Sequence, residues 1–322
     1  MPVPAIRCGK TGITLLVLLF LTLTLSCAHF SHELNSLSVS ELPRSADIPS
    51  VPFYPQEAYQ CGPAAMAMVL QWTKANVSLQ DLIPKVFVPA KKGSLQPALI
   101  SAARRYNRLA YPIKGVEALL KELAAGHPVI ILQNLGLQWF PRWHYSVPIG
   151  YNLTEGIFIL HSGKEARRRM SWTLFMRMWK RADYWGLVVL PSGQLPASAD
   201  EQSYLRAVLG LEQSRQFKGA AAAYAAALER WRSSFGALMG LGNCRYALGD
   251  LSGAELAFRH AAEAHPQSGA SFNNLAHVLA EQGRYAEALQ MAIRAVDIGG
   301  PNKALYLRTL QEVQAIIKTG PE

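Results

Sequence analysis

The chain has 322 residues, of which half are hydrophobic and 17% are charged, and its formal net charge is +10. This length allows two domains of ordinary size. No nucleic-acid motif accompanies the excess of basic residues, so nucleic acid is not predicted as a partner. The four cysteines have no paired spacing, so neither a disulfide framework nor a metal site is predicted, and no cofactor is expected.

Residues 1–26 have the pattern of a signal peptide. Arg7 and Lys10 precede a run from Ile13 to Leu25 that is apolar apart from three threonines. A run of this length fits a signal-peptide core and is too short to span a bilayer as a helix. The run ends at Leu-Ser-Cys, which resembles a bacterial lipobox, whose cysteine becomes the lipidated first residue of the mature protein.

This resemblance implies a lipoprotein of the bacterial cell envelope with its lipid on Cys27. Ala28 rather than Asp follows the cysteine, so the usual sorting rule implies the outer membrane, with the protein facing the periplasm. Thr24 stands where a lipobox usually has Leu, which leaves a plain signal peptide and an uncleaved anchor as alternatives. Residues 27–50 are polar and rich in Ser, and they are predicted to form a tether.

Residues 51–191 mix helical and strand patterns. Helices are expected over 63–73, 78–83, 95–106 and 116–125. Strands are expected over 129–132, 144–151, 157–161 and 185–190. Helices followed by an antiparallel sheet predict an α+β domain.

Residues 192–200 are predicted to be a linker, and a repeat follows. Cuts at 201, 235 and 269 give three units of 34 residues that end at 302. Each unit has Ala at the same two positions, which are Ala220, Ala254 and Ala288, and Ala227, Ala261 and Ala295. This is the tetratricopeptide pattern, in which small residues stand where paired helices cross. Residues 303–322 are predicted to form a capping helix and tail, and the all-α repeat domain is expected to fold independently.

Cys61 stands where a loop turns into an apolar helix. Gly62 and Pro63 suit the first turn of that helix. A thiol at this end faces the positive pole of the helix dipole, which favours the thiolate, the reactive form of cysteine. His144 opens a predicted strand some 80 residues later. A cysteine and a distant histidine in this order indicate a nucleophile and its base.

The residues around these two positions resemble a known family. Gln56, Cys61-Gly62-Pro63-Ala64-Ala65 and the stretch from His144 to Asn152 look like the bacteriocin-processing, double-glycine cysteine peptidases. They are most similar to stand-alone bacterial lipoproteins of that family with C-terminal tetratricopeptide repeats. The resemblance implies a papain-like cysteine peptidase domain over 51–191. It further implies Cys61 as the nucleophile, His144 as the general base and Gln56 as the oxyanion donor.

The sequence departs from the family at two places. The family's Gln usually lies six residues before the Cys, whereas Gln56 lies five before it, and Gln60 is the poorer alternative. The family orients its His with an Asp or Asn at the end of the following strand, where this chain has Ser162. Ser162, a backbone carbonyl or Asp183 is predicted to orient His144 instead. Cys61 and His144 are predicted to form a thiolate–imidazolium pair.

Together these features predict an envelope-anchored hydrolase, a thiol protease that cleaves peptide bonds after small residues such as Gly-Gly. Its expected partners are a peptide or protein substrate, a protein on the repeat surface, and the membrane through the N-terminal lipid. One alternative is a lipoprotein with little catalytic activity that binds a peptide and assembles a complex. The other is a thiol amidase or acyltransferase that acts on envelope components.

Overall fold

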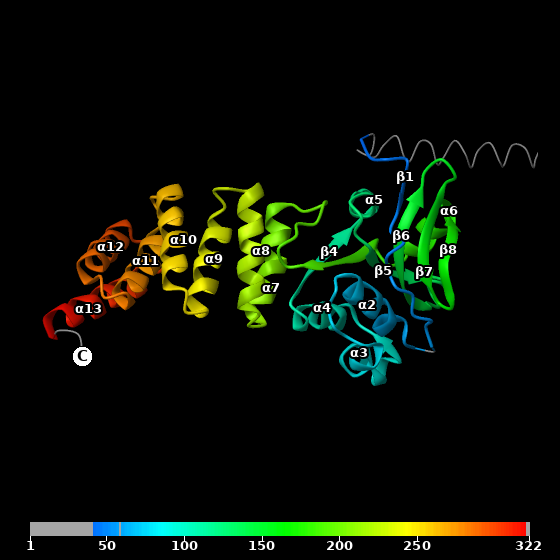
Figure 1. Cartoon of the computed structure of the whole chain (residues 1–322), viewed down its shortest axis with the longest axis horizontal. Coiled ribbons are helices and arrows are strands. Elements are labelled where there is room, and N and C mark those ends of the chain that lie inside the picture. The colour runs from blue at the N-terminus through cyan, green and yellow to red at the C-terminus, as the bar shows by residue number, and fades with distance from the viewer. Residues whose placement is uncertain (1–40, 58, 320–322) are drawn as a thin grey trace, which may run out of the picture.

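The computed structural model describes residues 41–57 and 59–319. The predicted signal peptide, Cys27 and most of the predicted tether lie outside these residues. Among the residues described, no helix combines the length and the apolar character that a membrane span requires. A domain built around a sheet lies at one end of an elongated molecule, and an array of paired helices leads away from it to α13 (Figure 1).

The sheet of the first domain is antiparallel throughout. Six of its strands follow the order β4-β9-β5-β6-β7-β8, and β1 pairs with β6 off this path. The strands are β1 (Ser45–Asp47), β4 (Arg108–Lys114), β5 (Val129–Asn134), β6 (Trp143–Asn152), β7 (Ile157–Ser162), β8 (Glu165–Ser171) and β9 (Trp185–Pro191).

Strand β6 is the centre of this sheet. Its first residues pair with β5, so that His144 lies opposite Gln133, and its last residues pair with β1. On the other edge β7 runs beside it, with His161 opposite Val147. The end of β7 therefore comes next to the start of β6, as the predicted hairpin requires.

Three strands of the main sheet and one helix depart from the sequence prediction. Strand β1 lies inside the predicted tether, and Ile48 behind it is buried in the core. The prediction that residues 27–50 are only a tether is therefore wrong at its end, because Ser45–Asp47 extend the sheet. Strands β4 and β8 and the helix α6 (Trp172–Lys180) were not predicted.

The predicted cysteine-bearing helix is α2 (Cys61–Trp72), and most of it lies inside the domain. Every residue from Gly62 to Leu70 is buried, which explains why the helix is apolar on all sides rather than on one face. Gly62 allows β3 (Gly93–Ser94) to approach, because a Cβ at this position would lie 2.3 Å from the Ser94 Oγ. Helix α2 also packs against β5 and β6, which brings its first residue to the middle of the sheet.

The remaining short elements complete the first domain. They are α3 (Leu79–Val86), β2 (Phe87–Val88), η1 (Pro89–Lys91), α4 (Gln96–Arg105) and α5 (Val116–Ala124). Ser78 and Asp81 form a capping box at the start of α3. Strands β2 and β3 form a small separate sheet, and they carry the chain past the first turn of α2.

The second domain consists of three helix pairs and a final helix. The first helix of each pair begins at residue 201, 235 or 269, as the 34-residue period predicts. The pairs are α7 (Glu201–Gln213) and α8 (Phe217–Arg230), α9 (Phe235–Ala247) and α10 (Leu251–Ala264), and α11 (Gly269–Glu281) and α12 (Tyr285–Ile298), followed by α13 (Lys303–Thr319). All six periodic alanines are fully buried. The prediction of an α+β domain followed by an all-α repeat domain is confirmed.

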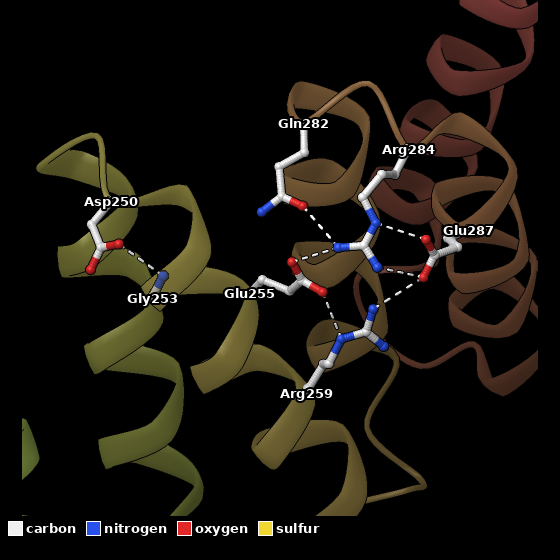
Figure 2. Close-up of polar contacts among 7 residues, drawn as sticks. All are labelled: Asp250, Gly253, Glu255, Arg259, Gln282, Arg284 and Glu287. Atoms are coloured by element: carbon white, nitrogen blue, oxygen red, sulfur yellow. Dashed lines mark hydrogen bonds and ion pairs between the residues drawn. The ribbon is translucent and has the colours of Figure 1, made fainter.

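A network of charged side chains joins the second and third repeats. Glu255 of α10 accepts hydrogen bonds from Arg259 at 2.8 Å and from Arg284 at 2.7 Å. Glu287 of α12 contacts the same two arginines, which closes the network (Figure 2). Isolated surface pairs contribute little to stability, whereas a closed network fixes several side chains at once. The network therefore holds the two repeats in register.

The first repeat packs directly on the sheet. Helix α7 contacts the edge strand β4, and Tyr204, Val208 and Leu211 belong to the same hydrophobic cluster as the sheet. The predicted linker is packed as well, because Ala199 is buried and Ser198 is hydrogen-bonded to Glu122. Residues 192–200 are thus a fixed connection. A repeat fragment cut at residue 199 would expose the apolar face of α7, and its independent folding stays a prediction.

Glu122 should be the key polar residue of this connection. Its fully buried carboxyl group accepts from the Ser198 amide at 2.7 Å and from the Ser198 hydroxyl at 2.6 Å, and it contacts the His127 ring at 2.7 Å. Replacing Glu122 by Ala leaves these half-buried groups without their partner. We expect a loss of about 3 kcal/mol in the free energy of unfolding, measured by urea denaturation.

A control is available on the same helix. Glu117 pairs with Lys121 one turn away, and both side chains are substantially exposed. Replacing Glu117 by Ala should change the unfolding free energy by about 0.5 kcal/mol or less. Equal losses for the two variants would show that Glu122 does not anchor the connection.

Candidate active site

The predicted site residues lie around one cleft. It has a volume of about 930 Å³ and lies between the start of α2, the segment that leads into α4, and the start of β6. Gln56, Cys61 and His144 all line it. Residues that are about 80 positions apart in the chain thus face one space, which is the arrangement that a nucleophile and its base require.

The sulfur of Cys61 is half-buried beneath β6. The backbone amides of Tyr145, Gly62 and Cys61 itself lie close enough to favour the thiolate, yet burial outweighs them and raises the pKa of the thiol. The sequence prediction of a thiolate at Cys61 considered only the effect of the helix N-terminus on the thiol pKa. It is wrong for the free protein, because burial of the Cys61 thiol has a larger effect on its pKa than the amides at the end of the helix.

His144 lies at the start of strand β6 and is held there by a residue of β7. Its Nε2 lies 3.0 Å from the Ser162 hydroxyl, which leaves Nδ1 as the ring nitrogen that can act on a proton. Burial, followed by the positive charge of Arg168, lowers the pKa of His144 to about 4. At neutral pH the ring is therefore uncharged, and because the pKa of the Cys61 thiol is raised, the cleft holds a neutral thiol and a neutral imidazole instead of the predicted ion pair.

The neutral pair predicts the pH dependence of alkylation at Cys61. A raised thiol pKa means that the thiolate appears only above the ordinary cysteine range near pH 8.5. We expect the rate of reaction with iodoacetamide to rise steadily through that pH. A thiolate–imidazolium pair would instead give a plateau that begins near pH 4 to 5. Peptide mapping by mass spectrometry over pH 4–10 distinguishes the two profiles.

Gln56 bridges the strands that surround the site. Its backbone amide donates to the Gly163 carbonyl, its Oε1 accepts from the Gly163 amide at 2.9 Å, and its Nε2 donates to the Tyr145 carbonyl at 3.2 Å. One Nε2 hydrogen is used in this way, and an amide has two. The second hydrogen is available to a ligand in the cleft. Gln60, the alternative, is not among the residues that line the cleft.

The structure distinguishes the residues that were predicted to orient His144. Ser162 contacts the ring, as the hairpin predicts. Asp183 does not, because it pairs with Lys114 at 2.6 Å and its side chain is 81% exposed. His161 is buried elsewhere, with its ring against the Val51 carbonyl and the Arg167 amide. A hydroxyl therefore stands where the family has an acid or an amide.

Several residues of the cleft were not predicted. Tyr145 contributes its backbone amide to the Cys61 sulfur, and its hydroxyl donates to the Ser94 carbonyl at 3.2 Å. Lys91, Lys92 and Arg142 make the rim basic, with Glu57 as the acidic residue among those lining the cleft. Their place depends on how β3 and β6 pack around α2, and no sequence period records that. Within the described ranges, no group of His, Cys, Asp and Glu has an arrangement that could hold a metal ion.

The comparisons with known proteins agree with this division of the chain. Residues 48–185 match the family model described as the Peptidase_C39 like family. Residues 205–269 and 269–299 match two models of the tetratricopeptide repeat. No curated protein matches the chain.

Solved structures resemble each half separately. A putative C39-like peptidase from Bacillus anthracis is 19% identical, covers 45% of this chain and 97% of its own, and gives a TM-score of 0.39. A double glycine motif protease from an AMS/PCAT transporter, solved with a leader peptide, is 25% identical over 45% of this chain and 93% of its own, with a TM-score of 0.37.

The helical half resembles a different kind of protein. The type III secretion translocator chaperone SycD from Yersinia enterocolitica is 20% identical, covers 40% of this chain and 97% of its own, and gives a TM-score of 0.36. On the family matches, the chain carries a domain of the Peptidase_C39-like family followed by tetratricopeptide repeats.

Proposed function

We propose that the protein is a cysteine peptidase that hydrolyses peptide bonds with Cys61 and His144. The observation that carries this proposal is their shared cleft, in which Ser162 holds the far nitrogen of the His144 ring. In the proposed reaction, Nδ1 of His144 takes the thiol proton as the sulfur attacks the peptide carbonyl. His144 then gives that proton to the leaving amine, and water hydrolyses the thioester that remains on Cys61.

The oxyanion formed in this reaction needs donors. The backbone amide of Cys61 and the second Nε2 hydrogen of Gln56 are the groups proposed for it. The open cleft suits an extended peptide, and small residues such as Gly-Gly before the cleaved bond would let its backbone approach the thiol closely. The repeats, in this proposal, recruit the protein that carries the peptide.

Gln56 gives a prediction that separates it from its neighbour. Replacing Gln56 by Ala should lower turnover by roughly a hundredfold, because a donor to the oxyanion is lost. It should also cost about 1–2 kcal/mol of stability, because the Gly163 amide and the Tyr145 carbonyl lose their partner. Replacing Gln60 by Ala should change neither quantity appreciably. Loss of turnover in the Gln60 variant alone would mean that the wrong glutamine has been assigned.

The experiment that tests the function is labelling with a peptide that carries a thiol-directed electrophile. Cys61 should react faster than a free thiol peptide at neutral pH, because the cleft binds and orients the peptide. Cys244 is an internal control, since it is buried and its pKa is raised to about 12 by burial and by Glu212. Labelling of Cys61 no faster than that of the free thiol would remove the basis for the enzyme.

A second function is favoured by one observation. A neutral thiol beside a weakly basic imidazole, with a hydroxyl in place of the acid, is a poor catalytic pair. This arrangement favours a domain that grips a peptide without cleaving it, while the repeats assemble a complex. Tight peptide binding without any product, unchanged in the Cys61→Ala variant, would support that function. A thiol amidase or acyltransferase would instead turn over a non-peptide amide or ester of the envelope.

We also propose that the protein is a lipoprotein of the bacterial envelope, anchored through Cys27 to the outer membrane and facing the periplasm. The support is the sequence pattern at residues 7–28. Intact-mass spectrometry of the membrane fraction should find a chain that lacks residues 1–26 and carries acyl groups. A product cleaved at another position and without acyl mass would contradict the anchor.

A further inference from the structure

The loop between β5 and β6 presents large apolar side chains to solvent. We call residues 135–142 the aromatic loop. Trp139 is 81% exposed and Phe140 is 69% exposed. In the sequence they follow two further exposed apolar residues, Leu135 and Leu137. Single exposed apolar residues are ordinary, whereas four in a segment of six residues mark a contact surface.

The fold holds this loop in its exposed form. The Asn134 Oδ1 accepts from the amides of Gly136 and Arg142, both at 2.9 Å, and the Leu135 amide donates to the Arg142 carbonyl. Arg181 donates to the Gly136 carbonyl from the end of α6. Gly136 allows the loop to close on itself, because a Cβ there would lie 2.4 Å from the Phe140 carbonyl oxygen. These hydrogen bonds therefore fix the conformation of the apolar tip.

The tip lies outside the cleft. Of the residues in and next to the aromatic loop, only Arg142 and Trp143 line the cleft, whereas Trp139 and Phe140 do not. A peptide that is bound in the cleft would leave these two rings in water. Lipid headgroups and acyl chains can rearrange around protruding rings, so the interface of a bilayer buries such rings from water.

The charges around the loop point to the same partner. Arg142 is exposed within the loop, and Arg177 and Lys180 occupy the last turn of α6, next to the anchoring Arg181. Tryptophan and phenylalanine beside basic residues are typical of segments that enter the headgroup region of anionic membranes. We propose that the aromatic loop inserts into the surface of an anionic phospholipid bilayer and so holds the mouth of the cleft at the membrane. This contact is independent of any lipid on Cys27.

The test measures the depth of Trp139 rather than binding, because the N-terminus can also hold the chain on a vesicle. The full chain is reconstituted into vesicles of phosphatidylethanolamine and phosphatidylglycerol at 3:1, with bromine on the acyl chains as a quencher. The emission of Trp139 is obtained by subtracting the spectrum of the Trp139→Phe variant, since the chain has seven tryptophans. We expect bromine to reduce this emission at least twofold. Vesicles of phosphatidylcholine alone should give a smaller reduction.

Two variants provide the controls. Replacing both Trp139 and Phe140 by Asp should abolish the contact, seen as restored acrylamide quenching of a dye placed at residue 138. Replacing Leu256, which is 51% exposed on the repeats, by Asp should leave the quenching of Trp139 unchanged. Equal acrylamide quenching of Trp139 with and without vesicles, and no bromine quenching, would overturn the proposal.

The same double variant distinguishes a peptide from a membrane. If it raised the KM for a soluble peptide at least tenfold without lipid present, while bromine did not quench Trp139, the loop would be a peptide-docking surface and the membrane proposal would fail. The outcome does not depend on the proposed catalysis, because the fluorescence of Trp139 is measured without substrate.

Discussion

Replacing His144 by Ala should lower peptide turnover by about 10² to 10⁴-fold, the usual contribution of a general base. The structural reason is that Nδ1 of this ring is the proposed acceptor for the proton of the buried Cys61 thiol, whose pKa is raised. Alkylation of Cys61 by a small electrophile above pH 9 should stay within about threefold of the wild type. In the neutral pair the thiolate forms by its own titration and does not depend on an imidazolium.

The matched variant is Ser162→Ala. It keeps the ring and removes the 3.0 Å contact to Nε2, so turnover should fall less than in the His144 variant. Thermal unfolding of both proteins checks that the fold is intact. Turnover in the His144 variant within threefold of the wild type would contradict the role of this residue as a base.

Replacing Ala254 by Asp should destabilise the repeat domain by about 3–5 kcal/mol, the scale for a buried charge without a partner. Ala254 is fully buried on α10, in a cluster with Phe258 of the same helix and with Leu275 and Leu279 of α11. Circular dichroism at 222 nm during urea denaturation measures the loss.

The control for this variant lies on the same helix. Ser252 is exposed near the start of α10, where a negative charge meets the positive end of the helix dipole. Ser252→Asp should therefore be neutral or slightly stabilising. An Ala254 variant as stable as the wild type would mean that the helices do not cross at this alanine.

The repeat domain could be predicted closely from the sequence, and the reason is physical. Each repeat packs on its neighbours through the same small residues, so the period of 34 residues and the positions of the alanines record the contacts directly. The helices α7, α9 and α11 begin at the three predicted positions. What the period does not record is the packing of α7 on β4, because that face has no counterpart in the later repeats.

The strands that were missed lack the patterns on which prediction relies. Strand β8 reads Glu-Ala-Arg-Arg-Arg-Met-Ser and buries only Met170, since it is an edge strand with both faces largely in water. Strand β4 contains Pro112, which normally argues against a strand. It is tolerated here because β4 is the edge of the sheet and has a partner strand, β9, on one side only.

The candidate site was predicted in its residues but not in its electrostatics. Cys61, His144 and Gln56 line one cleft, and Ser162 contacts the His144 ring. Their protonation states depend on how deeply α2 is enclosed and on Arg168 of β8, which lies near His144 but belongs to a strand that was not predicted. Burial is a property of the assembled fold, and it reversed the charge state that the end of the helix alone would favour.

The most direct test of the central claim is to trap the acyl group on Cys61. A peptide ester is incubated with the full chain, the reaction is stopped with acid, and the intact mass and the peptide map are recorded. We predict a mass increase equal to the acyl part of the ester, located at Cys61, in the wild type and none in the Cys61→Ala variant. Product formation without any adduct on Cys61, at the same rate in the variant, would contradict the proposed nucleophile.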